Sequence, residues 1–309
     1  MKIVMYHYIK KFKNTEFQGL KGLDLDEFKF QIDYLKSKFE ILNPKDIHEI
    51  IYEKKELKEN YCWLTFDDGY IDHYDNVIPI LEKNKLKASF FPPIKSTLQE
   101  TILDVNKIHL ILSKNNDYEK LLQEVKNILS EIKTKKDHNP FENLFINNNS
   151  TNRYDNAQVT LFKRLLQSDL PKKIREKICD ILFKKYVSKD IKFLSKKFYM
   201  NLSQIKTIFN LGHEIGIHSY DHDRLGNLNR QDQSNELSKS IQFWKKNGLL
   251  KEKFTFCYPY GDYNNDTLDI LKDAKCSLAL TTKVSNIPLK DYKPLELPRL
   301  DATDFPKSS

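Results

Sequence analysis

The 309-residue sequence has no stretch approaching the roughly 20 consecutive apolar residues that a membrane-spanning helix requires. Its first residues, MKIVMYHYIKKF, become polar and lysine-rich within about ten positions, so they lack the apolar core of a secretory signal. These two absences predict a chain without a membrane span that resides in the cytoplasm.

The four cysteines are far apart in the sequence and form no CxxC pair. This pattern favours reduced thiols in the core over disulfides or a cysteine-based metal site. Arginine is scarce, and the lysines behind the net charge of +8 are interleaved with Asp and Glu along the chain. Dispersed charge of this kind is typical of a solvated surface, so the sequence does not predict nucleic-acid binding.

Strand-like and helix-like segments alternate in the first third of the chain and again after residue 203. About eight β-rich runs occur, each preceded or followed by a helical pattern, such as Phe28, Ile32, Leu35 and Phe39 at helical spacing. This alternation predicts an α/β fold with a mostly parallel sheet, and the count favours a distorted (β/α) barrel over an open sheet. The β-rich runs are 2–9, 40–43, 61–70, 87–94, 213–219, 254–261, 277–282 and 295–301.

Residues 96–200 interrupt this alternation because they are strongly helical and carry no convincing strand. We therefore expect residues 1–95 and 201–309 to form the two parts of the barrel, with 96–200 as a helical insertion. An Asn-rich segment, 137–156, reads as a loop within the insertion. The insertion is either scaffolding that extends the barrel wall or a cap over the site. The amphipathic spacing of Leu121, Val125, Leu129 and Ile132 supports packing without deciding between the two.

Three polar clusters follow β-rich runs, where parallel α/β folds place reactive groups. They are the adjacent carboxylates Asp67 and Asp68 in WLTFDDGY, the histidines His218 and His222 in HSYDH, and the turn CYPYGDYN. Two histidines four residues apart and one carboxylate suffice to bind a catalytic divalent metal. A second carboxylate could then act as general base on a water. Alone, DDG indicates a turn and HxxxH a structural pair, but their joint presence favours a metal-dependent site.

The motifs TFDDG and HSYDH resemble the first two motifs of the polysaccharide deacetylase family, the NodB-like carbohydrate esterases of family 4. The flanking runs ASFF and GHEIGIHS also resemble that family. The variant pattern YHYI, YPYG and LPR is similar to the branch that includes poly-N-acetylglucosamine deacetylases. The resemblance covers roughly residues 1–95 and 200–305.

The resemblance implies the NodB-type barrel and a role for each motif residue. Asp67 would be the general base, and Asp68, His218 and His222 would bind the metal, which is commonly zinc in this family. The backbone N–H of Tyr260 would form the oxyanion hole. The reaction would be hydrolytic removal of an acetyl group from an N-acetylated sugar.

The sequence departs from the family pattern at two places. Cys257 stands where an arginine usually precedes the PYG turn, and we expect Arg299, near the last β-rich run, to replace that arginine beside Asp67. No histidine follows His222 to supply the usual general acid. His7, at the end of the first β-rich run, is the candidate replacement because the first and last strands of a closed barrel are neighbours.

The sequence therefore predicts a metal-dependent N-deacetylase, with zinc the expected metal, acting in cell-surface glycan biosynthesis or modification. Its substrate would be an N-acetylated sugar that is polymeric, lipid-linked or nucleotide-linked. Two alternatives stay open: an O-acetyl esterase or non-sugar amidase with the same site, and a catalytically inactive glycan-binding homologue.

Overall fold

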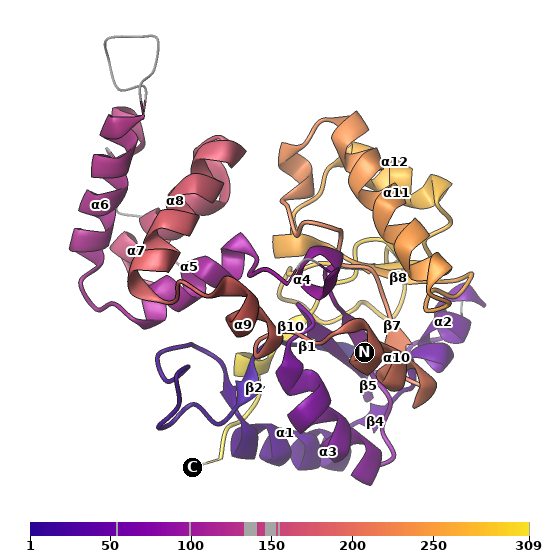
Figure 1. The fold of residues 1–309 in the computed structure, drawn as a ribbon. Coiled ribbons are helices and arrows are strands. Elements are labelled where there is room, and N and C mark those ends of the chain that lie inside the picture. Colours follow the sequence, from indigo (N-terminus) through magenta and orange to yellow (C-terminus); the bar gives the residue numbers. More distant parts are fainter. Residues whose placement is uncertain (54, 99, 133–140, 146–152, 154, 309) are drawn as a thin grey trace. The chain divides into compact units, whose positions relative to one another are not determined.

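The computed structural model describes residues 1–53, 55–98, 100–132, 141–145, 153 and 155–308. The chain divides into two compact units. Unit 1 comprises Met1–Lys11, Gly22–Thr101 and Ser195–Ser309, and unit 2 comprises Phe12–Lys21 and Ile102–Leu194. The named strands all belong to unit 1 and pair in parallel, so the predicted α/β class is confirmed (Figure 1).

The main sheet of unit 1 is built around β5 (Tyr61–Asp67), in which every residue is buried. β1 (Lys2–Tyr6) pairs with it on one side, and β6 (Ser89–Phe91) pairs with it on the other. Strands covered on both faces can be apolar throughout, which explains the continuous run YCWLTF. Three further strands complete the sheet: β10 (Leu300–Asp301) beyond β1, β7 (Glu214–Ile215) beyond β6, and β4 (Glu40–Ile41) beside the start of β5.

β8 (Thr255–Cys257) and β9 (Leu278–Leu280) form a separate parallel pair. Two isolated bridges connect this pair to the main sheet. Ile217, beyond β7, bridges to Phe256, and Leu280 bridges to Leu297, just before β10. Single bridges thus connect the pair to the main sheet on both of its sides. A third short pair joins β2 (Ile9–Lys10) and β3 (Leu23–Asp24).

The helices of unit 1 alternate with its strands along the chain. In α1 (Leu25–Lys38), the apolar residues Phe28, Ile32 and Leu35 are fully buried, as their spacing predicts. The extended backbone of Phe39 ends the helix at Lys38, and the Phe39 side chain is half-buried. The other α-helices and the π-helical turn are α2 (Pro44–Tyr52), η1 (His73–Val77), α3 (Ile78–Lys83), α4 (Ile94–Leu98), α10 (Leu202–Asn210), α11 (Arg230–Lys246) and α12 (Asn265–Asp273). Three short 3₁₀ helices accompany them, η4 (Leu225–Asn227), η5 (Pro259–Gly261) and η6 (Ala302–Asp304).

The regular elements of unit 2 in the part that the structure describes are helices, whereas Phe12–Lys21 forms turns and irregular backbone. On α6 the residues Leu121, Val125 and Leu129 are buried, whereas Ile132 follows the end of the helix and is half-buried. Lys107 joins two helices of the unit because its ammonium group pairs with Asp180 at 2.7 Å. The predicted loop 137–156 lies largely outside the described residues. The main helices are α5 (Asp104–Ser113), α6 (Tyr118–Glu131), α7 (Ala157–Arg164), α8 (Lys172–Tyr186) and α9 (Ile191–Lys196), the last of which ends in unit 1.

In the part of the chain that the structure describes, none of the helices is both long and apolar enough to cross a bilayer. The core of unit 1 centres on aromatic rings contributed by the central strands. Phe66 on β5 stacks on Tyr6 of β1 at 5.1 Å and on Phe90 of β6 at 4.8 Å between ring centroids. Burying each such ring stabilises the fold by about 1.5–3 kcal/mol. This packing fixes the carboxyl end of β5, where the polar residues begin.

Candidate active site

The predicted site residues come together in unit 1, most of them at the carboxyl ends of its strands. Asp67 is the last residue of β5, and Asp68 follows it. His218 and His222 follow β7, and Arg299 immediately precedes β10. The structure therefore brings together residues that are separated by more than two hundred positions in the sequence.

Asp68, His218 and His222 form a compact triad of donor atoms. Asp68 Oδ1 lies 3.3 Å from His218 Nε2 and 3.2 Å from His222 Nε2, and the two Nε2 atoms lie 3.2 Å apart. Three donors about 2.1 Å from one tetrahedral cation would lie roughly 3.4 Å from each other. The observed triangle therefore fits a divalent metal, and two imidazoles with one carboxylate are a donor set typical of catalytic zinc.

The hydrogen bonds of Asp68 leave one of its oxygens available for such an ion. Tyr70 donates its hydroxyl to Asp68 Oδ2 at 2.5 Å, whereas the buried Oδ1 has no hydrogen-bond partner. Burial alone would raise the pKa of Asp68, but His222 and His218 outweigh it and hold the pKa well below the usual range. Asp68 is thus an anion with one oxygen facing two imidazoles.

The backbone carbonyl of Cys257 orients one of these imidazoles. His218 Nδ1 lies 2.8 Å from this oxygen. Because a carbonyl can only accept, Nδ1 carries the hydrogen, and in the neutral ring Nε2 keeps its lone pair for a cation. A hydrogen bond of 3.0 Å from the His222 backbone N–H to Ser219 Oγ holds the loop between the two histidines.

Several residues of the site have left-handed backbone conformations, which are strained for residues other than Gly. The φ angles of Asp68, Ser219, His222 and Tyr260 are 70°, 57°, 62° and 59°. Such strain, of the order of 1–3 kcal/mol per residue, tends to collect at functional sites. Gly69, at φ 65°, also needs its small size because a Cβ there would lie 2.6 Å from Pro92 Cβ.

Asp67 is held in a different way, by a buried arginine. Arg299 donates from Nη1 to Asp67 Oδ1 at 2.9 Å and from Nη2 to Oδ2 at 2.8 Å. Burial raises the pKa of Asp67, but the charge and hydrogen bonds of Arg299 outweigh burial and hold it at about 2. Further hydrogen bonds to Thr281 O, at 2.9 Å, and Thr65 Oγ1, at 3.3 Å, fix the guanidinium.

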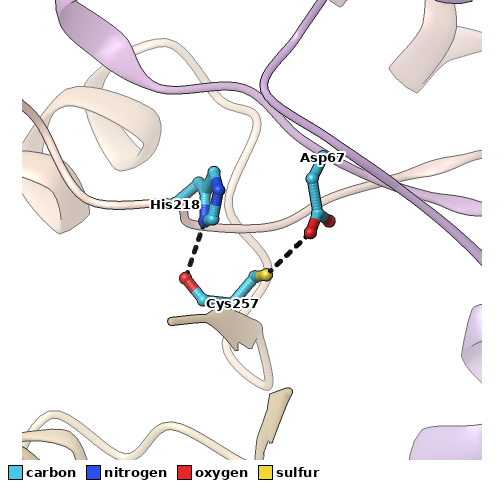
Figure 2. A group of neighbouring side chains, drawn as sticks. All are labelled: Asp67, His218 and Cys257. Atoms are coloured by element: carbon cyan, nitrogen blue, oxygen red, sulfur yellow. Dashed lines mark hydrogen bonds between the residues drawn. The ribbon is translucent and has the colours of Figure 1, made fainter. Parts of the chain in front are cut away.

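The thiol of Cys257 lies between these two groups. Its Sγ is 3.4 Å from Asp67 Oδ2 and 3.2 Å from Arg299 Nη2. Figure 2 shows how Cys257 joins the two halves of the site, with its carbonyl on His218 and its sulfur on Asp67. The atoms of Asp67, His218 and Cys257 are close enough to share a metal. However, the adjoining guanidinium would repel a cation, so the geometry favours the Asp68 triad.

The two remaining predicted residues lie at the edge of this cluster. His7 Nε2 is 3.9 Å from Asp67 Oδ2, and the side chain of His7 is 38% exposed. The ring of Tyr260 packs edge-on against His222, with centroids 4.9 Å apart. The roles of His7 as acid and of the Tyr260 N–H as oxyanion donor stay predictions.

Sequence reasoning gave no role to Tyr70 or to the thiol of Cys257. Tyr70 follows the DDG glycine directly, so its place in WLTFDDGY was the available signal. Cys257 offered a signal too, because it occupies the position of the missing arginine. Neither contact could be read from the chain, because each depends on how strand ends meet.

Comparison with known proteins identifies the family. The profile described as polysaccharide deacetylase matches residues 54–128 and 167–279, more than half of the chain. A putative polysaccharide deacetylase of Bacillus subtilis (strain 168), YxkH, is 30% identical over 90 residues, which are 29% of this chain and 30% of that protein. The chain thus aligns with less than a third of that relative.

Two solved structures show a similar fold. The deacetylase PplD of Streptococcus pyogenes, in complex with acetate, superposes with a TM-score of 0.60 at 17% identity, covering 97% of this chain and 91% of its own. IcaB from Ammonifex degensii gives a TM-score of 0.54 at 17% identity, with the same coverage. Together with the family profile, these findings confirm the resemblance predicted from the motifs. The chain belongs to the polysaccharide deacetylase family.

Proposed function

We propose that the protein is a metal-dependent hydrolase that removes the N-acetyl group from an amino sugar. The observation that carries this proposal is that two adjacent aspartates have different hydrogen-bond partners. Arg299 occupies both oxygens of Asp67, whereas Asp68 keeps one buried oxygen free beside two imidazoles. One carboxylate is thus built to ligate a cation and the other to stay off it.

The residues of the chain fit the chemistry of amide hydrolysis. When bound, a divalent cation, for which zinc fits the donor set best, acidifies a water molecule and polarises the acetyl carbonyl. Asp67 stays ionised at neutral pH because of Arg299, so it accepts the proton of the water that attacks the carbonyl carbon. The C–N bond then breaks, and the amine nitrogen takes a proton, for which His7 is the candidate donor. The products are acetate and a free amine.

The substrate is proposed to be an N-acetylated sugar in a polymer, on a lipid carrier or on a nucleotide. Tyr260 N–H is the proposed donor to the oxyanion because its positive φ turns the backbone beside His222. The role of the helical segment 96–200 as a cap and the cytoplasmic location stay predictions.

The test is acetate release from N-acetylated oligosaccharides and nucleotide sugars, with and without a chelator. We expect release that stops on chelation and returns with zinc. Replacement of Asp67 by Asn should lower the rate by a factor of about 10²–10⁴, the range for loss of a general base, while metal content stays unchanged. Loss of metal with a preserved rate would overturn these roles.

The product distinguishes the remaining alternatives. A new amine supports N-deacetylation, whereas a new hydroxyl group would indicate an O-acetyl esterase. A protein that binds zinc but releases no acetate from any N- or O-acetylated substrate would be the inactive homologue.

A further inference from the structure

Arg224 lies beside the candidate site, although neither the motifs nor the proposed mechanism uses it. Its guanidinium carbon is 4.2 Å from the centroid of the Tyr260 ring. That ring contacts the imidazole of His222, one of the three proposed metal ligands. Two contacts therefore connect the guanidinium to the proposed metal site, and all three residues belong to unit 1.

The Arg224 side chain is half-buried and lacks a hydrogen-bond partner where one is expected. Its Nε is buried without a partner, and among the described residues no carboxylate lies within ion-pair distance of its guanidinium. A buried donor left unpaired destabilises the folded chain. Such a group in a folded protein calls for an explanation, and a ligand is one of the recognised ones.

Two carboxylates that contact the loop 218–228 accept backbone N–H groups of that loop. Asp262 Oδ2 accepts the backbone N–H of Gly226 at 2.9 Å. Glu236 Oε2 accepts those of Tyr220 and Asp221, at 3.0 and 3.1 Å. These carboxylates also weaken any long-range positive field, so a ligand of Arg224 must be held by short, directed hydrogen bonds.

We propose that Arg224 binds an anionic group, a phosphate or a carboxylate, that the substrate carries next to its N-acetylated sugar. This inference rests on the proposed function. Stacking on Tyr260 occupies a face of the guanidinium, whereas its N–H donors lie in the plane of the group and stay available. A planar fork of donors matches two oxygens of a phosphate or carboxylate, and stacking orients the fork in advance.

This subsite narrows the substrate class. A neutral homopolymer of N-acetylated sugars has no anionic group for Arg224 to bind. A sugar phosphate places its charge on the carbon next to the acetamido group, and an alternating uronic-acid polymer places it on the neighbouring ring. The contacts of the Tyr260 ring with Arg224 and with His222 place the subsite beside one of the proposed metal ligands.

The test compares three substrates that differ in the group next to the acetamide. They are the neutral N-acetylglucosamine tetramer, uridine-diphosphate N-acetylglucosamine, and a hyaluronan tetramer, which carries carboxylates. In the zinc-loaded protein, we expect Arg224→Gln to lower kcat/KM on at least one anionic substrate by about tenfold or more, mainly through KM. The neutral substrate should change by less than about twofold. Arg224→Lys should recover only part of the loss because it keeps the charge but not the fork.

Arg230→Gln is the matched control. Arg230 is exposed on α11, where it pairs with Asp266 at 2.8 Å. Its replacement by Gln should leave kcat/KM unchanged on all three substrates. Which anionic substrate responds distinguishes a phosphate from a carboxylate. An equal loss on neutral and anionic substrates would mean that Arg224 only supports Tyr260, and the inference would be wrong.

Failure of the proposed function gives a different result. If the native protein releases acetate from none of the substrates, the hydrolase proposal fails. Calorimetric titration with uridine diphosphate and a hyaluronan tetramer then tests the subsite directly. Binding of either probe that weakens about tenfold in Arg224→Gln supports the subsite, whereas no binding, or equal binding to both proteins, contradicts it.

Discussion

Both ends of the parallel strands in unit 1 bury an acid beside histidine, but the two clusters differ in how completely they are hydrogen-bonded. At the amino ends, Glu214 Oε1 lies 2.9 Å from His48 Nε2 and accepts from Thr255, and its Oε2 accepts from Ser89. At the carboxyl ends, Asp68 keeps a buried oxygen without a partner. The same residue types thus form a closed network in one place and an open one in the other.

The difference separates a structural cluster from a functional one. Each oxygen of Glu214 has a hydrogen-bond partner, and Ser277 Oγ occupies the second nitrogen of His48 at 3.0 Å. At the other end, the free oxygen coincides with left-handed backbone at Asp68 and His222. An unsatisfied atom held by a strained backbone indicates function more specifically than residue type does.

The strongest test of this comparison removes one histidine from each end. His222→Ala should abolish stoichiometric zinc binding and lower acetate release by about a thousandfold or more, because two donors cannot replace three. His48→Ala should bind zinc normally but lose about 1–3 kcal/mol of unfolding free energy, because a buried oxygen of Glu214 loses a hydrogen-bond partner. Metal analysis and urea unfolding measure the two effects. Loss of zinc binding in His48→Ala would contradict the assignment of a structural cluster to the amino ends of the strands and a metal-binding cluster to the carboxyl ends.

A second test compares two buried cysteines. We expect Cys257→Ala to lower kcat by about tenfold, because Asp67 loses its thiol neighbour, with KM and zinc affinity unchanged. Zinc affinity should persist because the carbonyl on His218 belongs to the backbone. Cys257→Ser should restore part of kcat, since a hydroxyl can donate to the same carboxylate.

Cys276→Ala is the control for this cysteine test. Its thiol contacts the carbonyls of Phe254 and Leu278 rather than a site residue. It should change stability alone. If Cys257→Ala also weakens zinc binding, the thiol supports the loop as a whole and not Asp67 in particular.

A third test concerns two neutral histidines, one at each end. Burial lowers the pKa of His73 and of His213 to about 4, from an ordinary value near 6.5. The unfolded chain therefore binds more protons than the folded one between these values, and stability falls as the pH drops through this window. Each histidine should remove roughly 2 kcal/mol between pH 7 and pH 5.

Urea unfolding at the two pH values measures this loss. His213→Phe removes one of the two histidines, so the loss of unfolding free energy that the pair causes between pH 7 and pH 5 should fall to about half. An unchanged pH dependence in this variant would show that the acid sensitivity has another origin.

Much of the fold was predictable because its signals are local. The β-rich runs and the apolar spacing of α1 identify elements whose burial follows from their own sequence. The two motifs of the candidate site are equally local, since each places its side chains at the end of one strand. By contrast, the contacts of Cys257 and Tyr70 depend on the register between neighbouring strands, which a single sequence does not encode in any short pattern.

The contact of Arg299 was partly predictable from the sequence. Its position at the last β-rich run predicted that it would reach Asp67, and the structure places the two groups in a bidentate pair. The prediction rested on the place of Arg299 in the last β-rich run and on the missing arginine at Cys257. The role of Arg299 in catalysis stays a prediction, as do those of His7 and Tyr260.

The pair between Asp67 and Arg299 spans 232 positions of the chain. Contacts of such long sequence separation form late, because the entropy of closing a large loop is lost before the contact contributes any stabilisation. The sheet around β5 can assemble earlier from β1, β5 and β6, which lie within the first hundred residues. During refolding, secondary structure should therefore return before activity does, and the lag between them would measure how fast the last strand docks.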